Sequence, residues 1–129
     1  MFGQLPAYGF YCRHVKGLKL NDVQLQTAQP DLRHAVACDD VEDLEMVGLD
    51  VRPTAGAASI LRLTQVRDAL IRGCRPHGAA DTFVELHGET TRDVLLMEND
   101  FSRMSKVAAL SPEVPSGALE ETANHSHKN

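Results

Sequence analysis

The sequence predicts an all-β chain that folds as a right-handed parallel β-helix, a solenoid of about four to five coils. An apolar spacing recurs along the chain, since Val41 follows Val15 by 26 positions and Val66 follows Val41 by 25. Such a period is typical of stacked units that bury their apolar faces only against a neighbouring unit. Before each of these valines, apolar and polar residues alternate, as in strands with one buried face. Helical spacing with caps is not found before residue 111.

The alternation assigns inward and outward positions in the first strand of each copy. The inward positions are expected to be Phe10 and Cys12, Val36 and Cys38, Leu61 and Leu63, and Leu86 and Gly88. The outward positions are expected to be Tyr11 and Arg13, Ala37 and Asp39, Arg62 and Thr64, and His87 and Glu89. This alignment stacks Phe10, Val36, Leu61 and Leu86 in one interior column. A second short strand is expected at 18–20, 44–46, 69–71 and 94–96.

A leucine-rich repeat is the alternative solenoid, because Val15, Leu18 and Leu20 also satisfy its Leu-x-x-Leu-x-Leu spacing. That fold needs a helical segment in each coil and a recurring asparagine, for which only Asn99 would serve. The alternating strands therefore favour a β-helix, which we expect over residues 1–110. Residues 111–129 are expected to form a flexible or partly helical C-terminal tail, because prolines and a glycine precede a short Ala-Leu-Glu-Glu run.

Composition narrows the function classes. The 129 residues suit a single domain, and with 5% aromatic residues the core must be aliphatic. The net charge of −5 comes from interleaved acidic and basic residues without a basic stripe, so we expect no nucleic-acid partner. The chain has no apolar run of about 18 residues and no leader-like start. We therefore expect a soluble chain with no signal peptide and no membrane partner, in a compartment that the sequence leaves open.

The three cysteines, Cys12, Cys38 and Cys74, form a small and odd set that argues against a disulfide scaffold. Cys12 and Cys38 are equivalent in the first two copies, so we expect them to stack as small buried side chains. A disulfide between adjacent coils is the alternative. No Cys-x-x-Cys and no close histidine pair accompanies them, so we expect no metal site and no cofactor.

Residues 6–23 read Pro-Ala-Tyr-Gly-Phe-Tyr-Cys-Arg-His-Val-Lys-Gly-Leu-Lys-Leu-Asn-Asp-Val. The pattern continues with Val-Ala-Cys-Asp-Asp-Val-Glu-Asp-Leu at 36–44 and Leu-Ile-Arg-Gly-Cys at 70–74. These stretches resemble the coils that follow the catalytic region in glycoside hydrolase family 28, the polygalacturonase-like branch of the pectin-active β-helices. The resemblance covers about residues 6–101. It implies the C-terminal part of such a protein, without the part that performs the chemistry.

Members of that family carry Asn-Thr-Asp, Asp-Asp, His-Gly and Arg-Ile-Lys motifs on successive coils of one strand face. This chain has neither Asn-Thr-Asp nor Arg-Ile-Lys, and Asp39-Asp40 and His87-Gly88 lie about two coils apart. An inverting glycosidase holds its acid and base carboxyls roughly 6.5–9.5 Å apart, which needs a tighter arrangement than this. The family's catalytic roles are therefore not transferred to these residues.

The best polar cluster is predicted on an outward row made by Tyr11, Ala37, Arg62 and His87. In this register Arg62 lies beside His87, with Glu85 and Glu89 nearby. As a functional site, Arg62, Tyr11 and Arg13 would bind an acidic sugar. His87, Glu85 or Glu89 would then act as the general acid or base.

Ser59 lies one coil from Glu85 and near His87 in the same register, which would make a Ser/His/acid site, for example in an esterase. No Gly-x-Ser-x-Gly elbow accompanies it. The structural alternative for this face is a solvated surface or a subunit contact. Outward pairs of Arg13 with Asp39 and of His14 with Asp40 are expected on it.

Two function classes follow. The first is a truncated polygalacturonase-like module that lacks the family's catalytic motifs, assembles with copies of itself and binds carbohydrate. The second is a hydrolase, a glycosidase or carboxylesterase, whose site is rebuilt on the outer strand face or at a subunit interface, with an acidic polysaccharide or a small ester as its partner. A short solenoid exposes backbone groups at both ends, so we expect a homo-oligomer, a dimer or a trimer. Gly9, Ala35 and Ile60 form the outward row expected to pack side by side.

Overall fold

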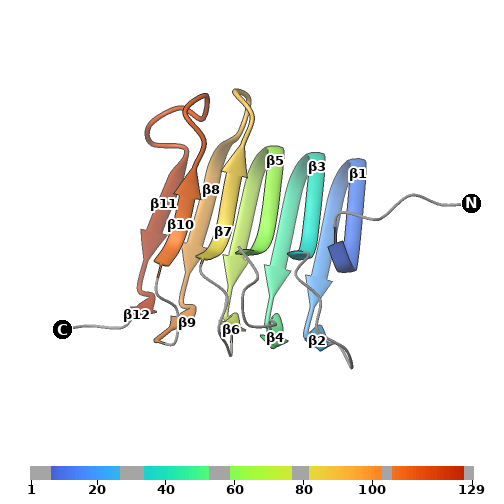
Figure 1. The fold of residues 1–129 in the computed structure, drawn as a ribbon, viewed down its shortest axis with the longest axis vertical. Helices are drawn as coiled ribbons and strands as arrows, with labels where there is room; N and C mark the ends of the chain where they lie inside the picture. The colour runs from blue at the N-terminus through green and yellow to red at the C-terminus, as the bar shows by residue number, and fades with distance from the viewer. Residues whose placement is uncertain (1–6, 27–33, 53–58, 77–81, 103–105, 127–129) are drawn as a thin grey trace, which may run out of the picture.

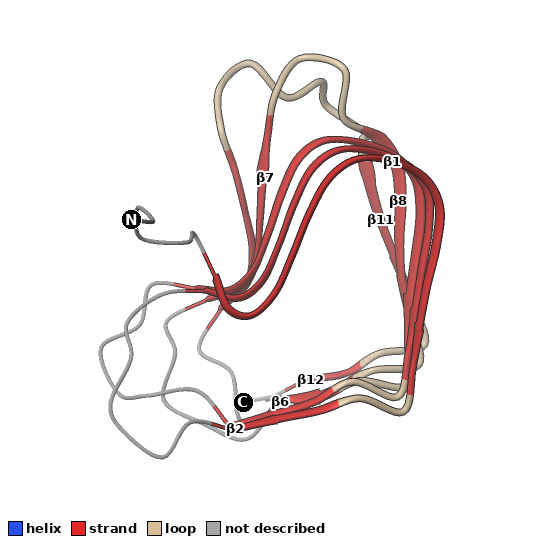
Figure 2. Cartoon of the chain, turned by 90° about the vertical axis from the view of Figure 1, so that its right-hand side faces the viewer, coloured by secondary structure: helices blue, strands red, loops and turns tan. Residues whose placement is uncertain are grey.

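The computed structural model describes residues 7–26, 34–52, 59–76, 82–102 and 106–126. Within these ranges the chain is all-β, with no helix, and its parallel strands stack as a β-solenoid. The predicted fold class is confirmed. Figure 1 shows the coils side by side from β1 to β12, and Figure 2 shows one coil in outline. No helix in the described ranges is long and apolar enough to cross a membrane.

Each of the first three coils consists of one long bent strand followed by a short strand across the coil. The long strands are β1 (Ala7–Asn21), β3 (His34–Val47) and β5 (Ser59–Arg72), and the short ones are β2 (Gln24–Gln26), β4 (Asp50–Arg52) and β6 (Arg75–Pro76). In the fourth coil the long strand is divided into β7 (Thr82–His87) and β8 (Arg92–Met97), and β9 (Asp100–Phe101) follows. The last coil contains β10 (Lys106–Leu110), β11 (Leu119–Thr122) and β12 (His125–Ser126).

The long strands turn corners at single residues in the left-handed backbone conformation. Each corner recurs from coil to coil. One is made by His14, Asp40 and Gln65, the next by Gly17, Asp43, Asp68 and Asp93, and the third by Asp22, Gly48, Gly73, Glu98 and Ala123. Small polar residues and glycine tolerate this conformation best, which explains why aspartate and glycine dominate these columns. One residue per corner lets the strand bend while its neighbours stay in the parallel ladder.

Aliphatic side chains fill the interior in columns with one residue from each coil. Leu44 pairs with Ala69, and Ala69 with Val94. Met46 pairs with Ile71, and these two side chains are fully buried. The stacked cysteines Cys12 and Cys38 are buried and free, as expected. Burial raises the pKa of Cys38 to about 12, so its thiol stays protonated at neutral pH.

The predicted interior column of Phe10, Val36, Leu61 and Leu86 is wrong in its last member. Val84 pairs with Leu61, and Leu86 pairs with Leu63 instead. The reason is a pair of compensating length changes. The connection before β7, residues 77–81, is two residues shorter than the equivalent connection in the coil before, residues 52–58. The corner after β7, residues 87–93, is two residues longer than the equivalent corner at residues 64–68. The apolar period therefore survives while the first strand of the fourth coil shifts by two positions.

Two residues predicted to face outwards for side packing are buried instead. Ala35 and Ile60 are each 1% exposed and belong to the core. Phe83, which occupies the equivalent position of the next coil, packs against Phe101 of β9 with 4.7 Å between ring centroids. The strands curve near their start (Figure 2), and in this row Phe83 contacts Phe101 of the short strand β9. The simple alternation of faces fails at such a bend.

Residues 111–126 of the predicted flexible or partly helical tail instead continue the solenoid, and residues 127–129 lie outside the described ranges. β11 pairs with β8, and β12 pairs with β9. Val114 and Ala118, in the loop between β10 and β11, are buried in the core. Asn124 accepts hydrogen bonds from the backbone and side chain of Asn99 at 2.9 and 3.1 Å, so the two asparagines form a short ladder at one corner. The prolines and the glycine of 112–117 therefore shape a corner loop.

Candidate functional site on the outer strand face

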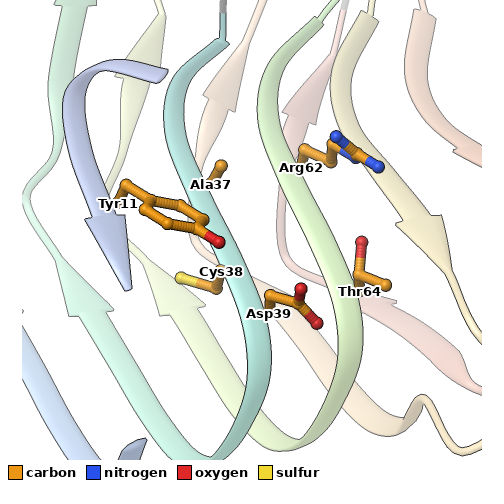
Figure 3. Close-up of a pocket in the computed structure, with 6 residues that line it drawn as sticks. All are labelled: Tyr11, Ala37, Cys38, Asp39, Arg62 and Thr64. Carbon is orange, nitrogen blue, oxygen red and sulfur yellow. The ribbon is translucent and has the colours of Figure 1, made fainter. Parts of the chain in front are cut away.

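A shallow depression lies on the outer face of β1, β3 and β5. It is lined by Tyr11, Ala37, Cys38, Asp39, Arg62 and Thr64, and its volume is about 60 Å³. Pockets that enclose small ligands usually measure about 300–1,000 Å³, so this depression does not enclose one. Figure 3 shows the Tyr11 ring beside Ala37, and Arg62 reaching away from Tyr11 towards the next strand.

The register sets the polar rows of this face. Tyr11 pairs with Ala37, Ala37 with Arg62, and Arg62 with Glu85. The neighbour of Arg62 is therefore Glu85, and the prediction that it lies beside His87 is wrong because of the two-position shift in β7. His87 pairs with Thr64. Among the described residues, no carboxylate oxygen lies within 4.0 Å of the Arg62 guanidinium, which is exposed.

Arg13 and His14 lie where the sequence places them. The Arg13 guanidinium is 3.9 Å from the Asp39 carboxylate, and His14 is 2.7 Å from the Asp40 carboxylate. Exposed pairs of this kind contribute little to stability, because water screens the charges. Hydrogen bonds from His14 and then from Arg67 hold the pKa of Asp40 below its ordinary value. Both expected outward pairs are confirmed, and Arg13 is engaged by Asp39.

Glu85, His87 and Ser111 form a hydrogen-bonded cluster at the edge of the same face. The His87 Nε2 atom is 2.9 Å from Glu85 Oε1, and the Ser111 hydroxyl is 2.5 Å from His87 Nδ1. A carboxylate only accepts hydrogen bonds, so Nε2 carries a proton, and in the neutral ring Nδ1 then accepts from the Ser111 hydroxyl. Burial raises the pKa of Glu85, but hydrogen bonds from His87 and Ser59 outweigh it and leave that pKa below its ordinary value. Glu85 is therefore ionised at neutral pH.

Ser59 is the second side chain whose hydrogen bond lowers the pKa of Glu85. Its hydroxyl is 2.8 Å from His34 Nδ1 and also contacts the Leu61 carbonyl at 3.4 Å. Ser59 is 1% exposed, so a substrate does not reach its hydroxyl from solvent. The ladder pairs Ser59 with Thr82, so the prediction that Ser59 lies one coil from Glu85 in register is wrong, and the Ser59 hydroxyl contacts His34 and not His87.

Glu89 is exposed in the corner between β7 and β8, and no hydrogen bond joins it to the described residues of this cluster. The carboxylate that contacts this corner is Glu113, whose Oε2 accepts a hydrogen bond from the Gly88 N–H at 2.9 Å. That hydrogen bond lowers the pKa of Glu113. Sequence reasoning missed Ser111 and Glu113 because it assigned them to a tail. The spacing of 25 residues between Asn99 and Asn124 is the signal that the repeat continues past them.

The described residues contain no group of three histidine, cysteine, aspartate or glutamate side chains arranged to hold a metal ion. Comparisons with models of protein families, with curated proteins and with solved structures find no match to this chain. The fold therefore defines the class. The protein is a parallel β-solenoid with a polar outer strand face.

Proposed function

We propose that this chain is a polygalacturonase-like β-helix module that lacks the family's catalytic motifs, binds an acidic polysaccharide and associates with copies of itself. The proposal of binding is supported above all by Arg62, an exposed guanidinium without a carboxylate partner among the described residues on the face that also carries Tyr11. A guanidinium pairs with a carboxylate through two parallel hydrogen bonds, which suits a uronate. Tyr11, 37% exposed, offers an aromatic surface to a sugar ring.

The arrangement of strands supports an extended ligand. Neighbouring strands repeat every ~4.8 Å, so polar groups on one face recur along the solenoid axis as chemical groups recur along a polysaccharide. Arg62 is one strand from Ala37 and two from Tyr11. The shallow depression between them leaves space for a chain that passes over the strands.

The binding test compares Arg62→Gln with Arg92→Gln, using isothermal titration calorimetry with oligogalacturonate at low salt. Arg92 is the matched control because it is equally cationic but lies on β8, where its Nε is 3.8 Å from Asp93. A hydrogen bond to a charged group contributes about 1.5–3 kcal/mol, so we expect roughly tenfold or greater loss of affinity for Arg62→Gln. Equal affinities for the two variants, or no binding by the wild-type chain, would contradict the proposal.

Self-association is supported by an asymmetry between the two ends of the described solenoid. In the first coil the column positions hold Val15, Leu18 and Leu20, which are only partly buried. Their partners in the next coil are buried. In the last coil the column of Leu96 ends in the exposed Glu121, although the columns of Leu86 and Val94 end in the apolar residues Leu110, 42% exposed, and Leu119, partly buried, so the difference between the ends rests on Glu121. A charged residue at such a position discourages further stacking, whereas β1 presents an apolar edge.

We therefore expect association through the β1 end as a closed dimer or trimer. Light scattering coupled to gel filtration tests this at micromolar concentrations. Leu18→Lys should shift the mass towards the monomer, and Thr122→Lys at the opposite end should not. A wild-type monomer across the whole concentration range would rule out the self-association.

A further inference from the structure

The Glu85–His87–Ser111 cluster unites side chains from two adjacent coils. Glu85 and His87 lie two positions apart on β7, and Ser111 immediately follows β10. The Ser111 N–H donates to the Leu86 carbonyl at 3.0 Å, which fixes the serine backbone against the end of β7. Figure 1 shows the loops after β7 and β10 rising together beyond the corner at which β3 and β5 simply bend. The cluster therefore belongs to a part of the solenoid where the last two coils differ from the others.

We propose that Ser111 is the nucleophile of an ester-hydrolysing site in which His87 is the general base and Glu85 is the positioning residue. Three features support this assignment. The Ser111 hydroxyl donates to an imidazole nitrogen that has no proton of its own, as a serine activated by a general base requires. The opposite nitrogen of the ring is held by an ionised carboxylate. The side chains of His87 and Glu85 are 32% and 23% exposed, so the cluster is accessible from solvent.

The contacts define the steps. Ser111 Oγ attacks the ester carbonyl carbon while its proton passes to His87 Nδ1, and an Oγ–C bond forms. The C–O bond to the alcohol then breaks, and the leaving alkoxide takes the proton from His87. Water attacks the acylated serine with His87 again as the base, which releases the carboxylic acid and restores the Ser111 hydroxyl. Glu85 stabilises the imidazolium in both halves and remains ionised throughout.

The surroundings indicate the class of ester. Pro112 follows Ser111 and has no backbone N–H, so it supplies no hydrogen bond to the oxyanion. Thr64, the neighbour of His87 on β5, is the hydroxyl-bearing side chain that the register places next to the ring. The depression lined by Thr64 and Arg62, on the strand next to that of His87, has a volume of only about 60 Å³, too small to enclose a long acyl chain. These features favour short acyl esters, such as acetyl esters, and a slow turnover. The inference goes beyond the proposed binding function and does not depend on it.

Covalent labelling tests the assignment even if turnover is slow. The full-length chain is treated with a fluorophosphonate, which transfers its phosphorus to an activated serine oxygen as the P–F bond breaks and fluoride leaves. Intact-mass and peptide mass spectrometry should find one label, on Ser111. Ser111→Ala should abolish it, and Ser116→Ala, an exposed serine of the same loop, should keep it. Circular dichroism confirms that each variant is folded.

Two further variants separate catalysis from a role in loop anchoring. His87→Gln should slow the labelling of Ser111 at least tenfold. Glu85→Gln should slow it less and should change its pH profile, because the ring loses its charged partner. In parallel, 4-nitrophenyl acetate should be hydrolysed by the wild-type chain and not by Ser111→Ala. Absence of label from the folded wild-type chain, or a labelling rate on Ser111 that His87→Gln leaves unchanged, would overturn the proposal.

Discussion

Leu18 and Leu44 offer a direct test of how burial changes along the solenoid, because they pair in the ladder and share one column. Leu44 is 1% exposed, with a coil on either side, whereas Leu18 in the first coil is partly buried. Leucine to alanine removes the equivalent of about three methylene groups, or about 2.4 kcal/mol of transfer free energy at about 0.8 kcal/mol each. A cavity adds to this where the surroundings do not collapse, so we expect Leu44→Ala to cost about 3–4 kcal/mol.

We expect Leu18→Ala to lower the free energy of unfolding by about 1 kcal/mol in the isolated chain. Folding removes the Leu18 side chain only partly from water, and its truncation leaves no closed cavity. Urea unfolding followed by far-UV circular dichroism measures both, since the chain has no tryptophan for fluorescence. The measurement is repeated at low and high protein concentration. If copies associate through β1, the cost of Leu18→Ala should rise with concentration, and that of Leu44→Ala should not. A cost of Leu18→Ala equal to that of Leu44→Ala at the lowest concentration would refute this account of the first coil.

Two further predictions concern a corner and the effect of pH. Gly48→Ala should lower the free energy of unfolding by about 1–2 kcal/mol in urea titrations, because Gly48 has a φ of 73° and an added Cβ would lie 2.6 Å from Asp22 Oδ1; an unchanged midpoint would contradict the role of the corner. The folded pKa of Glu85 lies below its ordinary 4.5, so its ionised form stabilises the fold above that pH, and the stabilisation is lost as the pH falls through the folded value. Unfolding midpoints at pH 7 and pH 3 should therefore differ less for Glu85→Gln than for the wild-type chain, and an identical difference would count against this linkage.

The fold could be predicted because the apolar repeat that determines it can be recognised in the sequence. A column such as Leu18, Leu44, Ala69 and Val94 has one apolar residue per coil, and the parallel ladder converts equal spacing into direct contact. The corner residues recur with the same period, but the spacing alone does not show that their aspartates adopt the left-handed conformation. Periodicity predicts stacking well because each coil packs mainly on its neighbours.

The candidate site was harder to predict because it depends on local departures from that period. A shorter connection before β7 and a longer corner after it cancel in the overall repeat, so the shift of Glu85 and His87 relative to Arg62 leaves no trace in the apolar spacing. The burial of Ile60 depends on strand curvature, which alternation does not encode. Ser111 was missed because Pro112 and its neighbours suggested a tail, although they form a corner loop that returns to the ladder.

The corner that follows Leu63, Leu86 and Leu110 in the three successive coils has a consequence for engineering. It spans residues 64–68 in one coil, 87–93 in the next and 111–118 in the last, and the following strands resume the same pairing each time. Extra length at this point is therefore absorbed without disturbing the remainder of the framework. Foreign peptides inserted between β7 and β8 would be displayed from a rigid spine, and their sequence could be varied freely while the scaffold keeps its shape.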